Sequence, residues 1–297
     1  MIEKKIKKRK KEENVGYLLV MPAMLLIVCF FAVTFVSNLI TSFTDEKTIQ
    51  FVGFQNYIKV LKDPAFFIAV KNTVIWTVCV TISQFLIGFF LALLCSHKVK
   101  GISFLRPIFI FPWAIPSIVA TLAWKWIYNT DFGVLNLLLR NLGIIQENIS
   151  WLTVPRTAML AAIIVSAWKG SPYYLMMLYA GLEGVPTDLY EAAEIDGANR
   201  RQRFIHITIP QIVPIISMSL TLGTIWTLNA YENLFALTGG GPSRKTETLP
   251  LYIYNTAFTY FRMHDAVVPS IVLFMCVIVL AGVYLLVKKK GGQTDEL

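Results

Sequence analysis

Apolar residues occur along this chain in long blocks without charged residues. Four such blocks contain 31 residues from Asn14 to Thr44, 25 from Asn72 to Ser96, 25 from Ile207 to Tyr231 and 22 from Ala266 to Val287. A helix needs about 20 apolar residues to cross the hydrocarbon layer of a membrane. Each block is therefore long enough to be a transmembrane helix. Together they exclude a soluble globular domain, a secreted disulfide scaffold and a disordered chain.

Two further apolar segments contain charges and are also expected to cross the membrane. Residues 104–128 hold Arg106 near one end and Lys125 near the other, and residues 157–180 are interrupted only by Lys169. We therefore predict an all-α membrane protein with six transmembrane helices, of which the third is kinked by its prolines. The approximate ranges are 17–43, 67–95, 104–128, 157–180, 210–238 and 267–287.

The distribution of lysine and arginine predicts the orientation in the membrane. If the N-terminus is inside, the cytoplasmic segments hold 16 of these residues and the outer segments hold 8. Because cytoplasmic loops carry the excess of basic residues, both termini are expected in the cytoplasm. The predicted organisation is a basic cytoplasmic tail (1–16), one membrane domain (17–287) with an external loop (131–156) and a cytoplasmic loop (182–208), and a cytoplasmic tail (288–297). A short amphipathic helix is expected within 51–67 on the outer surface.

Composition and motifs narrow the possible functions. The chain is 56% apolar and 15% charged, against roughly 45–50% and about 25% in soluble proteins. Seven of the 27 basic residues lie between Lys4 and Lys11, beside the first apolar block, so the net charge of +9 indicates contact with anionic lipid rather than nucleic acid. The sequence has no GxxxxGK[ST] motif and no histidine at ligand or triad spacing. We expect neither an enzyme nor a metal site.

Polar residues within the fourth predicted helix indicate a cavity. Lys169 lies near its middle, where a charge costs at least about 2.5–3.5 kcal/mol. Pro172 cannot donate to the carbonyl of Trp168, so a broken helix is expected there. Helical spacing places four residues on one face, namely Ser166, Lys169, Gly170 and Tyr173.

The fifth predicted helix offers a second polar face, formed by Trp226, Asn229, Ala230 and Asn233, with Glu232 beside it. Aromatic planes combined with amides suit a sugar, which has apolar faces and a rim of hydroxyls. The alternative is that Lys169 and Glu232 form a structural ion pair and that Trp226 only packs. The residues alone leave both interpretations open.

The cytoplasmic loop 182–208 has the pattern of two short helices joined by a turn. Thr187 or Asp188 can cap the first helix, Gly197 can end it, and residues 200–207 can form the second. Such a compact protrusion from the membrane is suited to docking into a partner protein.

The same loop resembles a known family. Glu191-Ala192-Ala193, three residues, Gly197, nine residues and then Ile207-Thr208-Ile209-Pro210 are similar to the EAA loop of membrane subunits of binding-protein-dependent ABC importers. The one departure is Ile209, where the family usually has leucine. Further segments resemble the carbohydrate uptake branch and its maltose-permease-like first membrane subunit, namely 51–57, 72–73, 106–107, 111–112, 124–126, 133–136 and 237–242.

The resemblance implies a type I ABC importer permease in the bacterial cytoplasmic membrane. The implied partners are a second homologous permease, two cytoplasmic ATPase subunits that bind ATP and Mg²⁺, and an extracytoplasmic solute-binding protein that delivers an oligosaccharide. This chain itself would bind no cofactor. The residues implied to couple it to the ATPase are Glu191, Ala192, Ala193, Gly197 and Pro210.

The resemblance also implies substrate contacts on the fourth and fifth helices, at Ser166, Lys169, Gly170, Tyr173, Trp226, Thr227, Ala230 and Asn233. Gly170 and Tyr173 match the sugar-contacting pattern of the maltose permease, and Trp226 replaces a phenylalanine. Asparagines are usual where this chain has Thr227 and Ala230, and an apolar residue is usual where it has Lys169.

The ammonium of Lys169 indicates an anionic substrate, such as a uronate-containing or sulfated sugar. Neutral oligosaccharides and glycerol-phosphate-like polyols are the alternatives within this family. A secondary transporter that uses Lys169 and Glu232 as an ion relay is an alternative of another class, but it leaves the cytoplasmic loop unexplained.

Overall fold

The computed structural model describes the backbone of residues 2–96 and 101–292 and the side chains of residues 17–96, 101–102 and 104–286. Lys98, Lys100 and the last five residues of the predicted C-terminal tail lie outside the described residues. Across the described ranges, every regular element is a helix, and the one β-type contact is an isolated bridge between Thr44 and Phe51. The helices are α1 (Ile2–Ser42), α2 (Gln55–Leu61), α3 (Pro64–Ser96), α4 (Ile102–Ala114), α5 (Ser117–Ile127), α6 (Val134–Asn141), α7 (Pro155–Glu183), α8 (Thr187–Ile195), α9 (Arg200–Arg203), η1 (Phe204–Thr208), α10 (Ile209–Asn229), α11 (Glu232–Thr238), α12 (Leu249–Tyr254), η2 (Asn255–Thr259) and α13 (Met263–Gly292).

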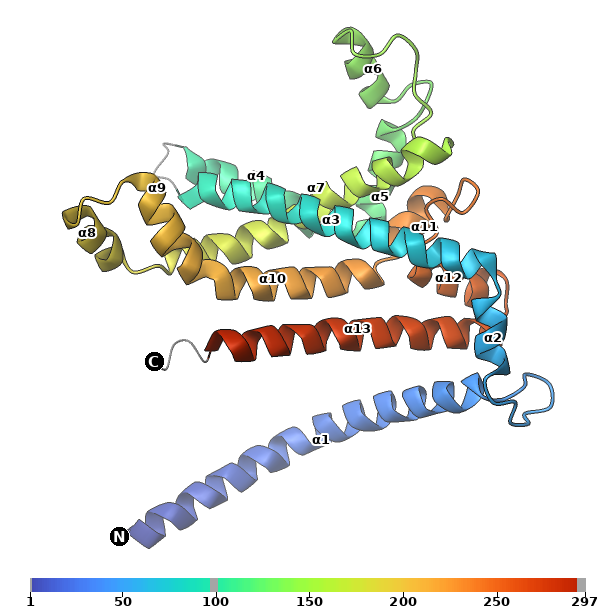
Figure 1. Cartoon of the computed structure of the whole chain (residues 1–297), viewed down its shortest axis with the longest axis horizontal. Coiled ribbons are helices and arrows are strands. Elements are labelled where there is room, and N and C mark those ends of the chain that lie inside the picture. The colour runs from blue at the N-terminus through green and yellow to red at the C-terminus, as the bar shows by residue number, and fades with distance from the viewer. Residues whose placement is uncertain (1, 97–100, 293–297) are drawn as a thin grey trace.

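The long helices run along one direction of the molecule (Figure 1). α3, α10 and α13 lie lengthwise, α7 crosses close to α3, and α1 diverges from the others toward its N-terminal end. α1 begins and α13 ends at the end of the molecule where α8 and α9 lie. This arrangement fits the predicted even number of crossings, while the side of the membrane on which that end lies stays a prediction.

Length and apolarity single out most of the predicted transmembrane helices. Among the described residues, four helices are long and apolar enough to cross a membrane: 17–42 in α1, α3, 200–229 through α9 and α10, and 263–286 in α13. The bent pair α4 and α5 is a fifth if it counts as one span. α7 has 29 residues but is not in this set. The count of six therefore stays a prediction, with α7 as the sixth long element.

The third predicted helix is broken rather than kinked. α4 ends at Ala114, α5 begins at Ser117, and their axes differ in direction by 98°. The residue before a proline is biased away from helical backbone, and Ile115 is accordingly extended, with φ −72° and ψ 133°. Pro116 at φ −54° then starts the new helix.

The break predicted at Pro172 is wrong, because α7 runs without interruption through that residue. The Ser171 hydroxyl donates to the Trp168 carbonyl at 3.3 Å, so the carbonyl that Pro172 leaves without a partner is satisfied. The fifth predicted helix, by contrast, stops early. Ala230 is extended, with φ −73° and ψ 121°, and separates α10 from the short α11.

The segments predicted to lie outside the membrane contain short helices that the sequence pattern did not predict correctly. The amphipathic helix expected within 51–67 is limited to α2, because the chain turns at Lys62 and Pro64 already begins α3. The short helices α6 and α12 lie in segments that were expected to be loops or turns. The glycines at 239–241 form a turn, and Gly239 ends α11 at φ 62°.

The core is formed mainly by α3 packed on α7. Gly88 of α3 permits this contact, since a Cβ there would lie 2.5 Å from the Cβ of Tyr174 and 2.7 Å from the carbonyl oxygen of Ser171. Tyr174 and Leu178 of α7 are fully buried. This tight pair carries one wall of the site described next.

Candidate functional site

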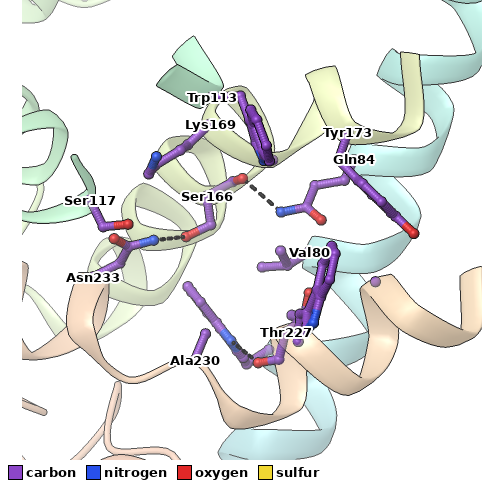
Figure 2. Close-up of a pocket in the computed structure, with 14 residues that line it drawn as sticks. Val80, Gln84, Trp113, Ser117, Ser166, Lys169, Tyr173, Thr227, Ala230 and Asn233 are labelled. Carbon is purple, nitrogen blue, oxygen red and sulfur yellow. Dashed lines mark hydrogen bonds between the residues drawn. The ribbon is translucent and has the colours of Figure 1, made fainter. Parts of the chain in front are cut away.

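A cavity of about 220 Å³ lies among α3, α7, α10 and the two helix breaks. Figure 2 shows Lys169, Ser117 and Asn233 on one side of it and Gln84 and Tyr173 on the other. All eight residues predicted to contact substrate line it: Ser166, Lys169, Gly170, Tyr173, Trp226, Thr227, Ala230 and Asn233. Helical spacing and the family resemblance together thus predicted residues that share one space, and their contact with substrate stays a prediction.

The side chain of Lys169 contacts the backbone at the break between α4 and α5. Its Nζ donates to the carbonyl oxygen of Ile115 at 2.7 Å. This carbonyl follows the end of α4, where helical hydrogen bonding is lost, so the ammonium acts as its cap. Lys169 and Glu232 form no salt bridge, so the structural ion pair considered as an alternative is absent, although the Glu232 carboxylate is near enough to attract the ammonium. An ammonium has three donors, so this contact leaves capacity for another acceptor.

A chain of hydrogen bonds joins four helices at the cavity. Gln84 of α3 donates to the Ser166 carbonyl at 2.8 Å, and the Asn233 amide donates to the Ser166 hydroxyl at 3.3 Å. The hydroxyl of Thr121 in α5 donates to the Asn233 carbonyl oxygen at 3.1 Å. Both short helices that follow the breaks, α5 and α11, are thereby fixed to the wall formed by α7.

Aromatic side chains supply the apolar surfaces of the cavity. The rings of Tyr173 and Trp226 meet edge to face with centroids 4.9 Å apart. Trp113 and Trp226 remain 51% and 56% exposed, so their faces are available to a ligand. The indole of buried Trp76 donates to the Thr227 carbonyl at 3.2 Å and fixes the backbone just before the second break.

Gly170 has a packing role as well as a place on the cavity wall. A Cβ at this position would overlap the side-chain amide of Gln84. The glycine therefore allows Gln84 to cross α7 and reach Ser166.

Two residues of the predicted face on the fifth helix lie elsewhere. Asn229 and Glu232 line an adjoining hollow of about 270 Å³ and not the main cavity. The Asn229 amide donates back to the Ile225 carbonyl at 2.8 Å. The reason is the break at Ala230, which ends the regular helical spacing assumed for residues 226–233.

The sequence analysis missed several lining residues, namely Trp76, Val80, Gln84, Trp113, Ser117 and Gly223. Gln84 carried a usable signal, because an amide within an apolar block needs a partner. Ser117 could have been found from its place next to Pro116. The others are apolar or small, and nothing distinguishes them from residues that only pack.

The predicted cytoplasmic loop, residues 182–208, contains the two-part element that was expected, with corrections to its ends. Gly197, at φ 78°, ends α8, and the next residue bonds back, Ala198 N–H to the Ala193 carbonyl at 2.8 Å. The predicted cap by Thr187 or Asp188 is wrong, since Pro186 precedes the helix and no side chain caps it.

The predicted separate helix 200–207 is also wrong. α9 starts at a capping box of Asn199 and Gln202 and continues through η1 directly into α10, because no residue there breaks the helix. Two contacts hold α8 against this continuous helix, Arg203 to Glu194 at 2.7 Å and Tyr190 to Thr208 at 2.8 Å. The predicted coupling residues Glu191, Ala192 and Pro210 are exposed.

Comparison with known proteins gives consistent matches. Residues 84–289 match the family described as binding-protein-dependent transport system inner membrane component. The trehalose/maltose transport system permease protein of Thermococcus litoralis is 33% identical over 93% of this chain and 94% of its own. The sulfoquinovosyl glycerol transport system permease of Agrobacterium fabrum is 32% identical over 90% of this chain and 88% of its own.

A solved structure confirms the fold. A chain of a bacterial ABC transporter involved in the import of the acidic polysaccharide alginate superimposes with a TM-score of 0.82. It is 21% identical and covers 97% of this chain and 99% of that one. Hence the predicted type I ABC importer permease fold is confirmed. The chain belongs to the family of binding-protein-dependent transport system inner membrane components, as a membrane permease subunit of an ABC sugar importer and not an enzyme.

Proposed function

We propose that this chain translocates an oligosaccharide that bears an anionic group, and that Lys169 contacts that group. The observation that carries the proposal is an ammonium in the cavity that has no ion pair within the described part of the chain and uses a hydrogen bond to Ile115. A carboxylate or sulfonate would supply a direct salt-bridge partner, which Glu232 does not. Trp113 and Trp226 would pack on the apolar faces of the sugar rings.

The named substrates of similar proteins support an anionic cargo without deciding it. One relative serves sulfoquinovosyl glycerol, and the similar structure belongs to an alginate importer. Another relative, which is 33% identical to this chain, serves trehalose and maltose. Neutral sugars and glycerol-phosphate-like polyols therefore stay the competing candidates, and Lys169 is the residue that favours the anionic class.

We further propose the assembly and its location. A second, homologous permease would complete the cavity, two cytoplasmic ATPase subunits would bind ATP and Mg²⁺, and an extracytoplasmic binding protein would deliver the sugar at the cytoplasmic membrane of a bacterium. A similar transporter has been crystallised with a periplasmic protein that holds an alginate pentasaccharide. ATP binding would move α8 with the ATPase and rock the permeases outward, and hydrolysis would reset them.

The continuity of α9, η1 and α10 supports this coupling. The helix is unbroken over the 30 residues 200–229, a length of about 45 Å. One end carries the contacts to α8, and the other carries Trp226 and Thr227 at the cavity. A displacement of α8 would thus reach the cavity through one rigid element.

The substrate proposal is tested on the complex reconstituted with its partner subunits. ATPase stimulation is recorded with neutral, uronate-containing and sulfonated oligosaccharides. We expect the anionic class to stimulate, and Lys169→Met to lower that stimulation at least about tenfold, since charge-assisted hydrogen bonds contribute about 1.5–3 kcal/mol. Lys169→Arg should retain much of it.

Lys125→Met is the matched control, because Lys125 is exposed on α5 and does not line the cavity. The thermal unfolding midpoint is measured as well, because loss of the hydrogen bond to the Ile115 carbonyl would lower stability, whereas loss of the substrate contact alone would not. Stimulation by neutral sugars alone, unchanged in Lys169→Met, would contradict the anionic proposal and leave the family assignment intact.

The coupling proposal is tested at Gly197. Gly197→Leu should abolish transport while insertion is kept, because a leucine strains the left-handed backbone that ends α8. Gly143→Leu is the control, since Gly143 also has positive φ, at 70°, but lies in the external loop. Normal uptake by Gly197→Leu would count against the coupling role.

A further inference from the structure

A second large hollow lies beside the loop 182–208, which we call the coupling loop, and away from the sugar cavity. It has a volume of about 590 Å³ and is enclosed by the ends of α3 and α7, by α8, and by α9 with η1. Figure 1 shows α8 and α9 at the same end of the molecule where α1 begins and α13 ends. We call it the arginine hollow after three of its lining residues, Arg200, Arg201 and Arg203.

The charge of the arginine hollow is only partly compensated. Arg203 pairs with Glu194 at 2.7 Å. Arg200 and Arg201 are exposed, and neither has an ion pair within residues 17–96, 101–102 and 104–286. Glu183 is the one carboxylate among its lining residues. Two cations thus remain available to an anionic ligand.

The rest of the lining is apolar or already hydrogen-bonded. Leu93, Leu182 and Phe204 give the hollow an apolar wall. The hydroxyls of Tyr190 and Thr208 bond to each other at 2.8 Å. A ligand that fits this hollow therefore needs an anionic group for the arginines and an apolar part for the wall.

The position of the hollow identifies the source of such a ligand. α3 is long and apolar enough to cross the membrane, α7 is predicted to cross it, and both end here, which places the hollow at the level where phospholipid headgroups meet the hydrocarbon layer. Basic pockets between transmembrane helices on the cytoplasmic side bind anionic headgroups. A soluble phosphate compound shares the anionic chemistry but does not use the apolar wall.

We propose that the arginine hollow binds the headgroup of an anionic phospholipid, with the phosphate at Arg200 and Arg201. Tyr190 belongs to α8 and the arginines belong to α9, so the bound lipid bridges the two arms of the coupling loop. It thereby adds to the two contacts that hold α8 in place, and coupling becomes dependent on anionic lipid. The effect on coupling rests on the proposed function, whereas lipid binding does not.

The test uses the complete complex in nanodiscs of phosphatidylcholine with or without phosphatidylglycerol. Lipid retained after purification is measured by native mass spectrometry, without sugar or ATP. The double variant Arg200→Gln with Arg201→Gln should retain about 30-fold less phosphatidylglycerol, from about 1 kcal/mol for each arginine near a lipid surface. The control removes two exposed arginines of the outer segment, Arg140→Gln with Arg156→Gln, and should retain it fully.

The outcomes separate the parts of the proposal. Equal retention by both double variants, or equal retention of the two lipids by the wild type, would overturn lipid binding. Displacement of the lipid by inorganic phosphate would assign the hollow to a soluble anion instead. Phosphatidylglycerol should raise sugar-stimulated ATPase activity in the wild type but not in the arginine variant; an equal rise in both would overturn the coupling part alone.

Discussion

α1 and α7 show opposite relations between apolarity and burial. The part of α1 from residue 17 to 42 is long and apolar enough to cross a membrane. In its most apolar stretch of 18 residues, no residue is buried inside this chain. α7 contains Lys169 and Pro172 and is not among the helices that are long and apolar enough to count as membrane spans. It has 13 buried residues. In this pair the more apolar helix is the more exposed one, whereas the polar residues of α7 face a cavity and other helices.

The two helices also differ in where they are held. α1 contacts the rest of the chain mainly in its C-terminal part, through ring contact of Phe35 with Phe274 and a hydrogen bond of Ser42 to Tyr57 at 2.9 Å. α7 is packed along its length by α3 and α4.

Gly88→Ala should destabilise the α3–α7 pair by about 1–3 kcal/mol, since the new methyl group meets the backbone of α7. The effect is read as a lower thermal midpoint of the purified complex. Gly282→Ala in α13 is the control, because a Cβ there has nothing within 4 Å. Equal midpoints for the two variants would show that α3 and α7 are not tightly packed.

The hydrogen bond between Thr121 and Asn233 should contribute less. A double-mutant cycle with Thr121→Val and Asn233→Leu should give a coupling free energy of about 0.6 kcal/mol, the average for hydrogen bonds between membrane helices. Unfolding in detergent supplies the four free energies. A value indistinguishable from zero would remove this bond from the network that fixes α5 and α11.

Leu26→Ala in α1 should change stability by no more than about 0.5 kcal/mol, because this side chain is 74% exposed. The same thermal measurement applies. A large loss in the isolated subunit would mean that α1 packs on the bundle. A loss that appears only in the full complex would instead locate a partner subunit on α1.

The turn after α1 should respond to pH with a small local effect. The pKa of Asp45 is lowered because its carboxylate accepts hydrogen bonds from the backbone and hydroxyl of Thr48 and the backbone of Lys47. Its stabilisation is complete above the unfolded pKa and is lost as pH falls through the lower native value. Amide hydrogen exchange at Thr48 should therefore lose protection in acid, and Asp45→Ala should remove this dependence.

The lengths of the apolar blocks, the helical spacing and the family resemblance were enough to predict the fold and eight of the residues that line the cavity. They could not predict which proline breaks a helix. Pro172 and Pro116 each remove one hydrogen bond, but Ser171 satisfies the carbonyl left by Pro172 from the neighbouring position. The Ile115 carbonyl finds its donor on Lys169, 54 residues later. A partner so distant in sequence becomes visible only in the folded chain.

The contact between Lys169 and Ile115 has a consequence for how the protein is made. α1 needs few partners in this chain, so it can enter the lipid alone as soon as it is synthesised. α7 carries a cation whose acceptor lies just past the end of α4, and α4 leaves the ribosome earlier. The acceptor for Lys169 is therefore already present when α7 arrives. We therefore expect the helices to insert in sequence. α4 and α5 enter the membrane first, and α7 with Lys169 then packs against them.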